Sequence, residues 1–175
     1  MNKLPIEKGR LSFVKKYEKR GIVMELMEKE KAAIKDLQTQ EQTCIKKYEK
    51  YSNEAKDPVL KDLFKSLQQK EQQHYDSLQQ VLTGSVPSCN CNDSDGKNYE
   101  PKATYNAMTD SEDKKKDNFL VTDCIATEKL VSSEYNTDVF VFANAALRKL
   151  LADILIEEQN HALMLYKYKT ANGMA

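Results

Sequence analysis

The two histidines of the sequence lie in matching surroundings. His74 follows Glu71 by three residues, His161 follows Glu158 by three, and the chain has only these 2 histidines. Side chains three residues apart on a helix point in the same direction, so each Glu-x-x-His pair can hold one metal ion. Sites built from carboxylates and imidazoles accept iron, manganese, zinc and cobalt, so the ligand types leave the metal open.

Another glutamate and a tyrosine precede each pair at the same distances. Glu41 and Tyr48 precede the first pair, and Glu128 and Tyr135 precede the second, with an offset of 87 residues between the halves. Both halves read Glu, six residues, Tyr, twenty-two residues and then Glu-x-x-His. The repeat predicts two similar halves that build one site together. The same offset also aligns Asp36 with Asp123, Asp57 with Asn144, Leu60 with Leu147 and Leu63 with Leu150.

The repeated glutamates and histidines fall on apolar helical stripes, where a charged side chain is costly unless it is paired or bound to a metal. Four carboxylates in one core would repel one another, and two divalent cations would neutralise them. We therefore predict a centre of two divalent metal ions, iron or manganese, in which Glu41 and Glu128 bridge or cap the pair. The predicted metal ligands are Glu41, Glu71, His74, Glu128, Glu158 and His161.

Tyr48 and Tyr135 lie two helical turns beyond the first glutamate of each half. They are predicted to take part in catalysis, either by hydrogen bonding to a ligand carboxylate or as local redox groups. The alternative for each is an ordinary core tyrosine. Asp36 and Asp123 also repeat, but they fall off the ligand stripe and are interpreted as surface or capping residues.

Four amphipathic helices are needed to carry these residues. Apolar residues recur at spacings of three and four around each glutamate, which is typical of a helix with one buried face. Asp57 and Asn144 suit helix N-caps, Pro58 suits a first helical position, and Gly84 suits a helix exit. The stripes include Ile34, Leu37 and Cys44; Leu60, Leu67 and Leu78; Val121, Cys124 and Val131; and Leu147, Ile154 and Leu165.

Polar, turn-rich breaks separate the helices and predict an all-α fold. The short breaks make each pair of helices an antiparallel hairpin, and a long break between the pairs suits a crossover that runs the length of a four-helix bundle. The predicted divisions are a basic tail or helix extension at residues 1–22, a helix pair at 23–83, a crossover linker at 84–118 and a second helix pair at 119–172.

The charge balance gives no sign of a nucleic-acid or membrane partner. Lysine plus arginine and aspartate plus glutamate both total 27. No segment is long and apolar enough to span a bilayer, and the polar start MNKLPIEKGR is not a secretory signal, so we expect a soluble protein made in the cytoplasm. The basic residues near the start are interpreted as a solvated surface rather than a binding arm.

The 4 cysteines are too few and too scattered for a disulfide framework. If the first and third helices are antiparallel, Cys44 and Cys124 lie on the same side of the metals, where they could face each other in a redox role. The common alternative is a buried cysteine that acts as a small apolar residue. Cys89 and Cys91 lie in the linker, where their thiols could cross-link partners, and their role stays open.

At the ligand positions the sequence resembles the ferritin-like superfamily, in particular bacterioferritins and rubrerythrins. The stretches FLVTDCIATEKLVSSEYNTDVF and LADILIEEQNHALMLYKYKTANGM also resemble the coat F family of bacterial spore coat proteins. These resemblances imply a ferritin-like fold, two metals and a place in the spore coat. The chain lacks the paired Cys-x-x-Cys motifs of a full rubrerythrin and its additional ligand glutamate, so the implied site is the six-ligand bacterioferritin type.

Two functions from different classes fit this reading. The first is an oxidoreductase in which the metal pair reacts with oxygen or hydrogen peroxide, as a ferroxidase, peroxidase or manganese catalase. The second is a structural spore coat protein, associating with itself or with other coat proteins, in which the metals are stabilising or vestigial. Iron storage is a weaker third possibility, because it needs a shell-forming surface.

Overall fold

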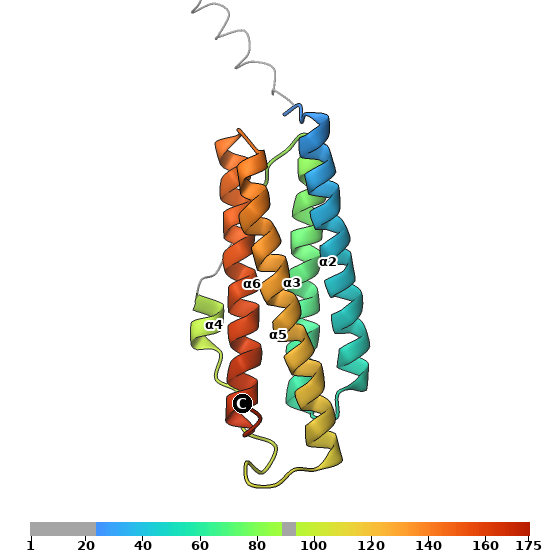
Figure 1. The fold of residues 1–175 in the computed structure, drawn as a ribbon, viewed down its shortest axis with the longest axis vertical. Coiled ribbons are helices and arrows are strands. Elements are labelled where there is room, and N and C mark those ends of the chain that lie inside the picture. The colour runs from blue at the N-terminus through green and yellow to red at the C-terminus, as the bar shows by residue number, and fades with distance from the viewer. Residues whose placement is uncertain (1–23, 89–93) are drawn as a thin grey trace, which may run out of the picture.

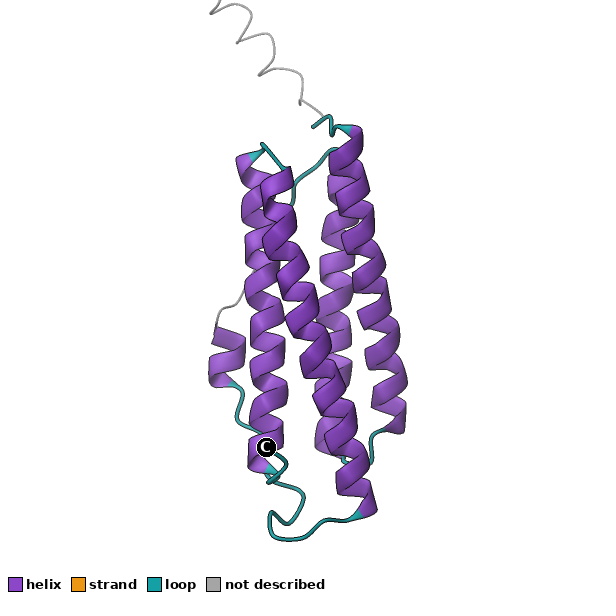
Figure 2. Ribbon diagram, in the orientation of Figure 1, coloured by secondary structure: helices purple, strands orange, loops and turns teal. Residues whose placement is uncertain are grey.

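The computed structural model describes residues 24–88 and 94–175, so the tail at residues 1–22 and the pair Cys89 and Cys91 lie outside the described residues. Within that part the chain is helical and contains no strand (Figure 2). The all-α prediction is confirmed. The elements are α2 (Glu28–Glu54), α3 (Pro58–Leu82), α4 (Ser94–Asn98), α5 (Glu112–Asp138), the 3₁₀ turn η1 (Val139–Val141) and α6 (Ala145–Ala171).

Two helix starts and one exit follow the predicted local signals. The Asp57 side chain accepts the backbone N–H of Val59 at 2.9 Å, directly before Pro58 at the first position of α3. Asn144 caps α6 in the same way. Gly84 follows α3 with a φ of 91°, a conformation that costs glycine little because it has no Cβ.

The third long helix begins earlier than predicted. α5 starts at Glu112 rather than at residue 119, because Ser111 accepts the backbone N–H of Lys114 at 3.1 Å and acidic residues follow in the first turn. The prediction places this charged run in the linker at residues 84–118, although lysine and glutamate are good helix formers. Within the described residues, the helix predicted from residue 23 is α2, which begins at Glu28, where the Glu30 carboxylate accepts the backbone N–H of Met27.

The four long helices pack side by side as two antiparallel hairpins, α2 with α3 and α5 with α6 (Figure 1). The crossover between α3 and α5 passes from one end of the bundle to the other, and its short helix α4 lies against α6. The predicted hairpin-crossover-hairpin order is thus observed. None of the described helices is long and apolar enough to cross a membrane.

The bundle core consists of two apolar clusters, one toward each end. The Ile34 cluster contains Phe142 from the α5–α6 turn, and the Phe64 cluster contains Ala55 from the α2–α3 turn. Cys44 belongs to the Ile34 cluster and Cys124 to the Phe64 cluster, and both are buried free thiols. The suggestion that they face each other is therefore wrong, because they pack in different clusters.

Candidate metal centre

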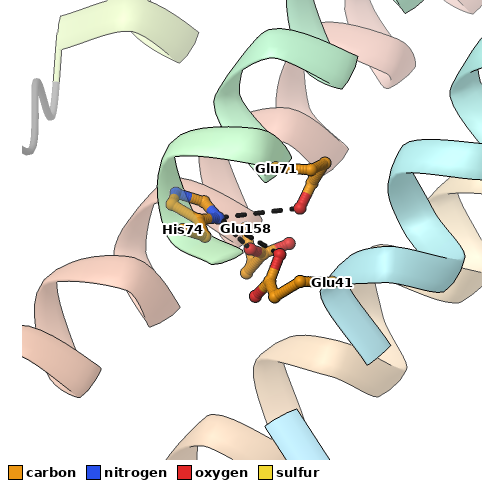
Figure 3. A group of neighbouring side chains, drawn as sticks. All are labelled: Glu41, Glu71, His74 and Glu158. Carbon is orange, nitrogen blue, oxygen red and sulfur yellow. Dashed lines mark ion pairs between the residues drawn. The ribbon is translucent and has the colours of Figure 1, made fainter. Parts of the chain in front are cut away.

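Buried carboxylates and imidazoles from all four long helices meet between the two apolar clusters. In the first group a ligand atom of each of Glu41, Glu71, His74 and Glu158 lies within 4.8 Å of those of the others (Figure 3). These residues come from α2, α3 and α6. The group therefore joins the two hairpins through the middle of the bundle.

The second group is the repeat counterpart of the first. It contains Glu71, Glu128, Glu158 and His161, again with ligand atoms within 4.8 Å of one another. Glu71 and Glu158 belong to both groups, so they lie between two positions that could each hold an ion. The structure thus brings all six predicted ligands together, and none of them is more than 3% exposed.

The cluster contains an unusual number of buried polar atoms without hydrogen-bond partners. One oxygen of Glu41 and one of Glu128 are in this state, as are both oxygens of Glu71 and both of Glu158. Nδ1 of each histidine completes the set. Buried polar atoms are nearly always hydrogen-bonded, so each exception calls for another partner such as a metal ion. All of these atoms are lone-pair donors, and a pair of divalent cations fits them.

Each imidazole turns Nδ1 toward carboxylates of both hairpins. His74 Nδ1 lies 2.9 Å from Glu158 and 3.6 Å from both Glu41 and Glu71. His161 Nδ1 lies 3.0 Å from Glu71, with Glu128 at 3.6 Å. The two rings stack with centroids 5.7 Å apart. The contacts of one histidine mirror those of the other, so the two repeated halves of the site are arranged with approximate two-fold symmetry.

The two tyrosines bind the glutamates of the opposite half. The Tyr48 hydroxyl on α2 donates to Oε1 of Glu128 on α5, and the Tyr135 hydroxyl on α5 donates to Oε1 of Glu41 on α2. The other oxygen of each glutamate carries no hydrogen bond and belongs to the cluster. Hydrogen bonding of these tyrosines to the carboxylates is therefore observed, and a redox role stays a prediction.

Burial and mutual repulsion favour protonation of the two outer carboxylates when no metal is bound. Burial raises the pKa of Glu41 well above its usual value, and the negative charge of Glu158 adds to the rise. Burial likewise raises the pKa of Glu128, with contributions from Glu71 and Glu158. A proton on each of these groups removes part of the repulsion that four carboxylates would cause.

The two shared carboxylates and the histidines behave as charged partners. Burial opposes ionisation of Glu71 and Glu158, but the imidazoles that face them outweigh it and lower the pKa of both carboxyl groups. Burial also opposes protonation of His74 and His161, yet the surrounding carboxylates raise the pKa of both imidazoles well above 6.5. Without metal, the cluster therefore balances its charge with protons.

One residue of the site was not found from the sequence. Glu157 on α6 places its carboxylate 2.5 Å from Nε2 of His74, on the side of the ring away from the cluster. It directly precedes Glu158 and lies one turn before His161, so its place on the buried stripe was the available signal. The helical periodicity places Glu158 on the stripe and gives no ligand role to Glu157.

The repeated aspartates lie outside the cluster. Asp36 is exposed, as predicted. Asp123 is neither a cap nor a free surface residue, because it accepts hydrogen bonds from Lys47 at 2.9 Å and from the Tyr51 hydroxyl at 2.8 Å. It therefore ties α5 to α2 beside the site.

Burial raises the pKa of the Cys44 thiol, so the thiol stays protonated, as its apolar packing requires.

The comparisons with known families divide the chain along its repeat. The Rubrerythrin family matches residues 3–82, and the Coat F domain matches residues 116–175. The chain is a ferritin-like helical bundle. In this ferritin-like bundle each match covers one helix hairpin, and each hairpin supplies half of the buried cluster. No curated protein and no solved structure gives a significant match.

Proposed function

We propose that this ferritin-like protein binds two divalent metal ions, iron or manganese, and that the loaded protein reacts with oxygen or hydrogen peroxide in the spore coat. The observation that carries the metal proposal is the convergence of buried lone pairs without hydrogen-bond partners from four helices. Carboxylate oxygens and imidazole nitrogens are suitable ligands for both metals. The family matches support the same proposal from the sequence side.

The hydrogen bonds assign different roles to the two kinds of glutamate. Glu71 and Glu158 keep both oxygens unpaired and belong to both ligand groups, which favours a bridging role. Glu41 and Glu128 each have one oxygen held by a tyrosine, which leaves one oxygen for a single ion. Of the two roles open to them from the sequence, the geometry supports capping.

The chain prepares the centre for redox chemistry by fixing its ligands and excluding water. A pair of iron or manganese ions supplies a two-electron change to an oxygen or peroxide substrate. Tyr48 and Tyr135 hold the capping carboxylates in place, and the tyrosine hydroxyls are the proton-bearing groups closest to them. The Ile34 and Phe64 clusters close the bundle on either side of the ligands.

A purely structural coat protein is the second candidate, and the Coat F domain match favours it. In that case the metals would hold the two hairpins together, or the site would be vestigial. The complete ligand set speaks against a vestigial site, because the loss of one ligand would be enough to break it. Association with itself or with other coat proteins remains part of both proposals.

Metal content tests the centre directly. Protein purified without chelators or an affinity metal should contain about two iron or manganese ions per chain by elemental analysis. Glu41→Ala and His161→Ala should each lower that content, and Asp36→Ala should leave it unchanged because Asp36 is exposed. Equal metal content in all three variants would refute the ligand assignment.

Reactivity separates the enzyme from the structural protein. Protein loaded with iron(II) or manganese(II) should consume oxygen or hydrogen peroxide faster than the free ion does at equal concentration. A loaded protein that resists unfolding better but consumes neither oxidant would support the structural role. Labelled protein followed through sporulation should reach the coat under both proposals, and its exclusion from the coat would refute that location.

A further inference from the structure

The two halves of the site differ at the position four residues before each histidine. The repeat offset pairs Glu157 on α6 with Lys70 on α3, so the residue four places before each histidine is an acid in one half and a base in the other. The six ligands and both tyrosines are identical between the halves. The metal positions therefore have the same ligands but different surroundings.

A carboxylate lies next to Nε2 of His74, on the side of the ring away from the ligand cluster. The Nε2 atom lies 2.5 Å from Oε2 of Glu157, whose side chain is 9% exposed. A carboxylate in this place accepts the Nε2 hydrogen, which leaves the lone pair of Nδ1 directed at Glu41, Glu71 and Glu158. A hydrogen bond of this kind fixes the tautomer and ring orientation of a metal-binding histidine and makes it a better donor.

His161 lacks the corresponding partner. The repeat would place the side chain of residue 70 behind its ring, and Lys70 cannot accept a hydrogen bond. Within the described part of the chain, no hydrogen bond from Nε2 of His161 is found. Among the described residues, the contacts that orient His161 are therefore its packing and those of Nδ1.

The crossover linker holds Lys70 near Glu157. Lys70 Nζ lies 3.1 Å from Asp95 on α4 and 3.9 Å from Glu157. α4 can approach α6 closely because Gly96 packs against Asn160, where a Cβ would lie only 2.6 Å from the side-chain oxygen. The chain of contacts thus runs from the linker through Lys70 and Glu157 to His74.

We infer that the two metal positions are inequivalent, and that Glu157 makes the His74 position the tighter one. This inference rests on the proposed metal centre and deepens it. Glu157 is a positioning residue, since it acts on the ion only through the imidazole. Lys70 and Asp95 hold its carboxylate in place from the linker side, which gives the long crossover a role in setting metal affinity.

Cobalt(II) titration of the metal-free full chain tests the inference, because cobalt(II) suits carboxylate and imidazole ligands and absorbs visible light. We expect two binding steps with dissociation constants at least about tenfold apart. Glu157→Gln should weaken the tighter step by about tenfold or more and leave the weaker step unchanged. The matched control is Glu49→Gln, an exposed glutamate on α2, which should change neither step.

The possible outcomes separate this inference from the proposed function. Two indistinguishable steps in the wild-type protein, or equal weakening of both steps in Glu157→Gln, would overturn the inequivalence while leaving the metal centre intact. A wild-type protein that binds no cobalt would overturn both. Circular dichroism of each variant confirms that the helices are retained before the constants are compared.

Nitrogen-15 NMR of the wild-type protein loaded with zinc(II) gives a second test that needs no variant. The Nε2 hydrogen of His74 should be visible and slow to exchange with solvent, because Glu157 accepts it in a buried place. The Nε2 hydrogen of His161 should exchange faster. Equal exchange of the two hydrogens, or a His74 ring protonated at Nδ1 instead, would overturn the inference.

Discussion

Tyr135 on α5 donates its hydroxyl hydrogen to Glu41 on α2, so the capping carboxylate of one hairpin is held by the other hairpin. Tyr48 and Glu128 form the reciprocal pair. Each hydrogen bond satisfies one carboxylate oxygen and leaves the second directed into the cluster. The tyrosines therefore connect the packing of α2 against α5 to the geometry of both metal positions.

Removing either hydroxyl should weaken metal binding and stability together. We expect Tyr48→Phe and Tyr135→Phe each to reduce metal affinity by about tenfold, because the capping carboxylate loses its fixed orientation. The free energy of unfolding of the metal-free protein should fall by about 1–3 kcal/mol, since a buried oxygen loses its donor. Metal titration and urea unfolding measure the two effects. The exposed Tyr166→Phe is the control, and a similar loss there would contradict this reading.

The bridging and capping glutamates should differ in how many ions their loss removes. Glu71→Ala and Glu158→Ala each remove a ligand shared by both groups, so bound metal should fall from about two ions per chain toward none. Glu41→Ala and Glu128→Ala remove a ligand from one group only and should leave about one ion. Elemental analysis after dialysis distinguishes the two classes. Loss of the same number of ions from all four variants would show that the roles are not divided in this way.

Metal binding should release protons, and affinity should rise with pH. In the metal-free protein the raised pKa values of Glu41, Glu128, His74 and His161 favour the protonated form of each group. A metal ion must displace these protons. Two ions replacing four protons leaves the net charge of the core unchanged. Calorimetry in buffers of different ionisation enthalpy counts the protons, and a count near zero would contradict the titration scheme.

The same groups make the metal-free protein less stable as pH rises. A group whose pKa is raised in the folded protein stabilises the fold fully at pH values below its unfolded pKa. This stabilisation is lost as the pH rises toward the folded pKa. The unfolded pKa is 4.5 for the two capping glutamates and 6.5 for the histidines. Glu71 and Glu158 have lowered pKa values, so their contribution is lost only in acid. The increase in melting temperature on adding manganese(II) should therefore grow from about pH 6.5 upward. Thermal scans across that range measure it, and a constant increase would count against this balance.

A buried aspartate on α5 that binds the backbone of the α2–α3 turn should matter for stability but not for metal content. Asp117 on α5 is fully buried and accepts the backbone N–H groups of Lys56 and Asp57 and the hydroxyl of Tyr105. Asp117→Ala leaves these donors unpaired, and the free energy of unfolding should fall by about 3 kcal/mol. Urea unfolding measures the loss against the exposed Asp36→Ala. A variant that keeps its stability but loses metal would mean that the turn acts on the site instead.

The convergence of these glutamates and histidines was predictable from the sequence because helical periodicity and the repeat constrain the same residues. Glu71 and His74 must share a helix face, and the offset places their counterparts on the matching helix. The N-cap chemistry of Asp57 and Asn144 is equally local, which explains why those boundaries agree with the structure. Information that lies within a few residues of one helix was sufficient for these features.

Contacts between distant elements could not be predicted in the same way. The pairing of Tyr48 with Glu128 depends on how α2 and α5 align, and that alignment is set by packing across the whole bundle. Glu157 was missed because its partner His74 lies on another helix. The start of α5 was misplaced because a charged run suits either a linker or an exposed helix, and burial of Lys114 and Asp117 decides between them.

The crossed tyrosine–glutamate pairs make each hairpin complementary to itself. If the first hairpin met a second copy of itself, Tyr48 of each would find Glu41 of the other, and every ligand type would be present twice. Such a symmetric pair would have to carry the same residue behind both histidines. Joining the copies in one chain removes that restriction, since position 70 could become lysine while position 157 became glutamate. Covalent duplication thereby allows one metal position to change without the other.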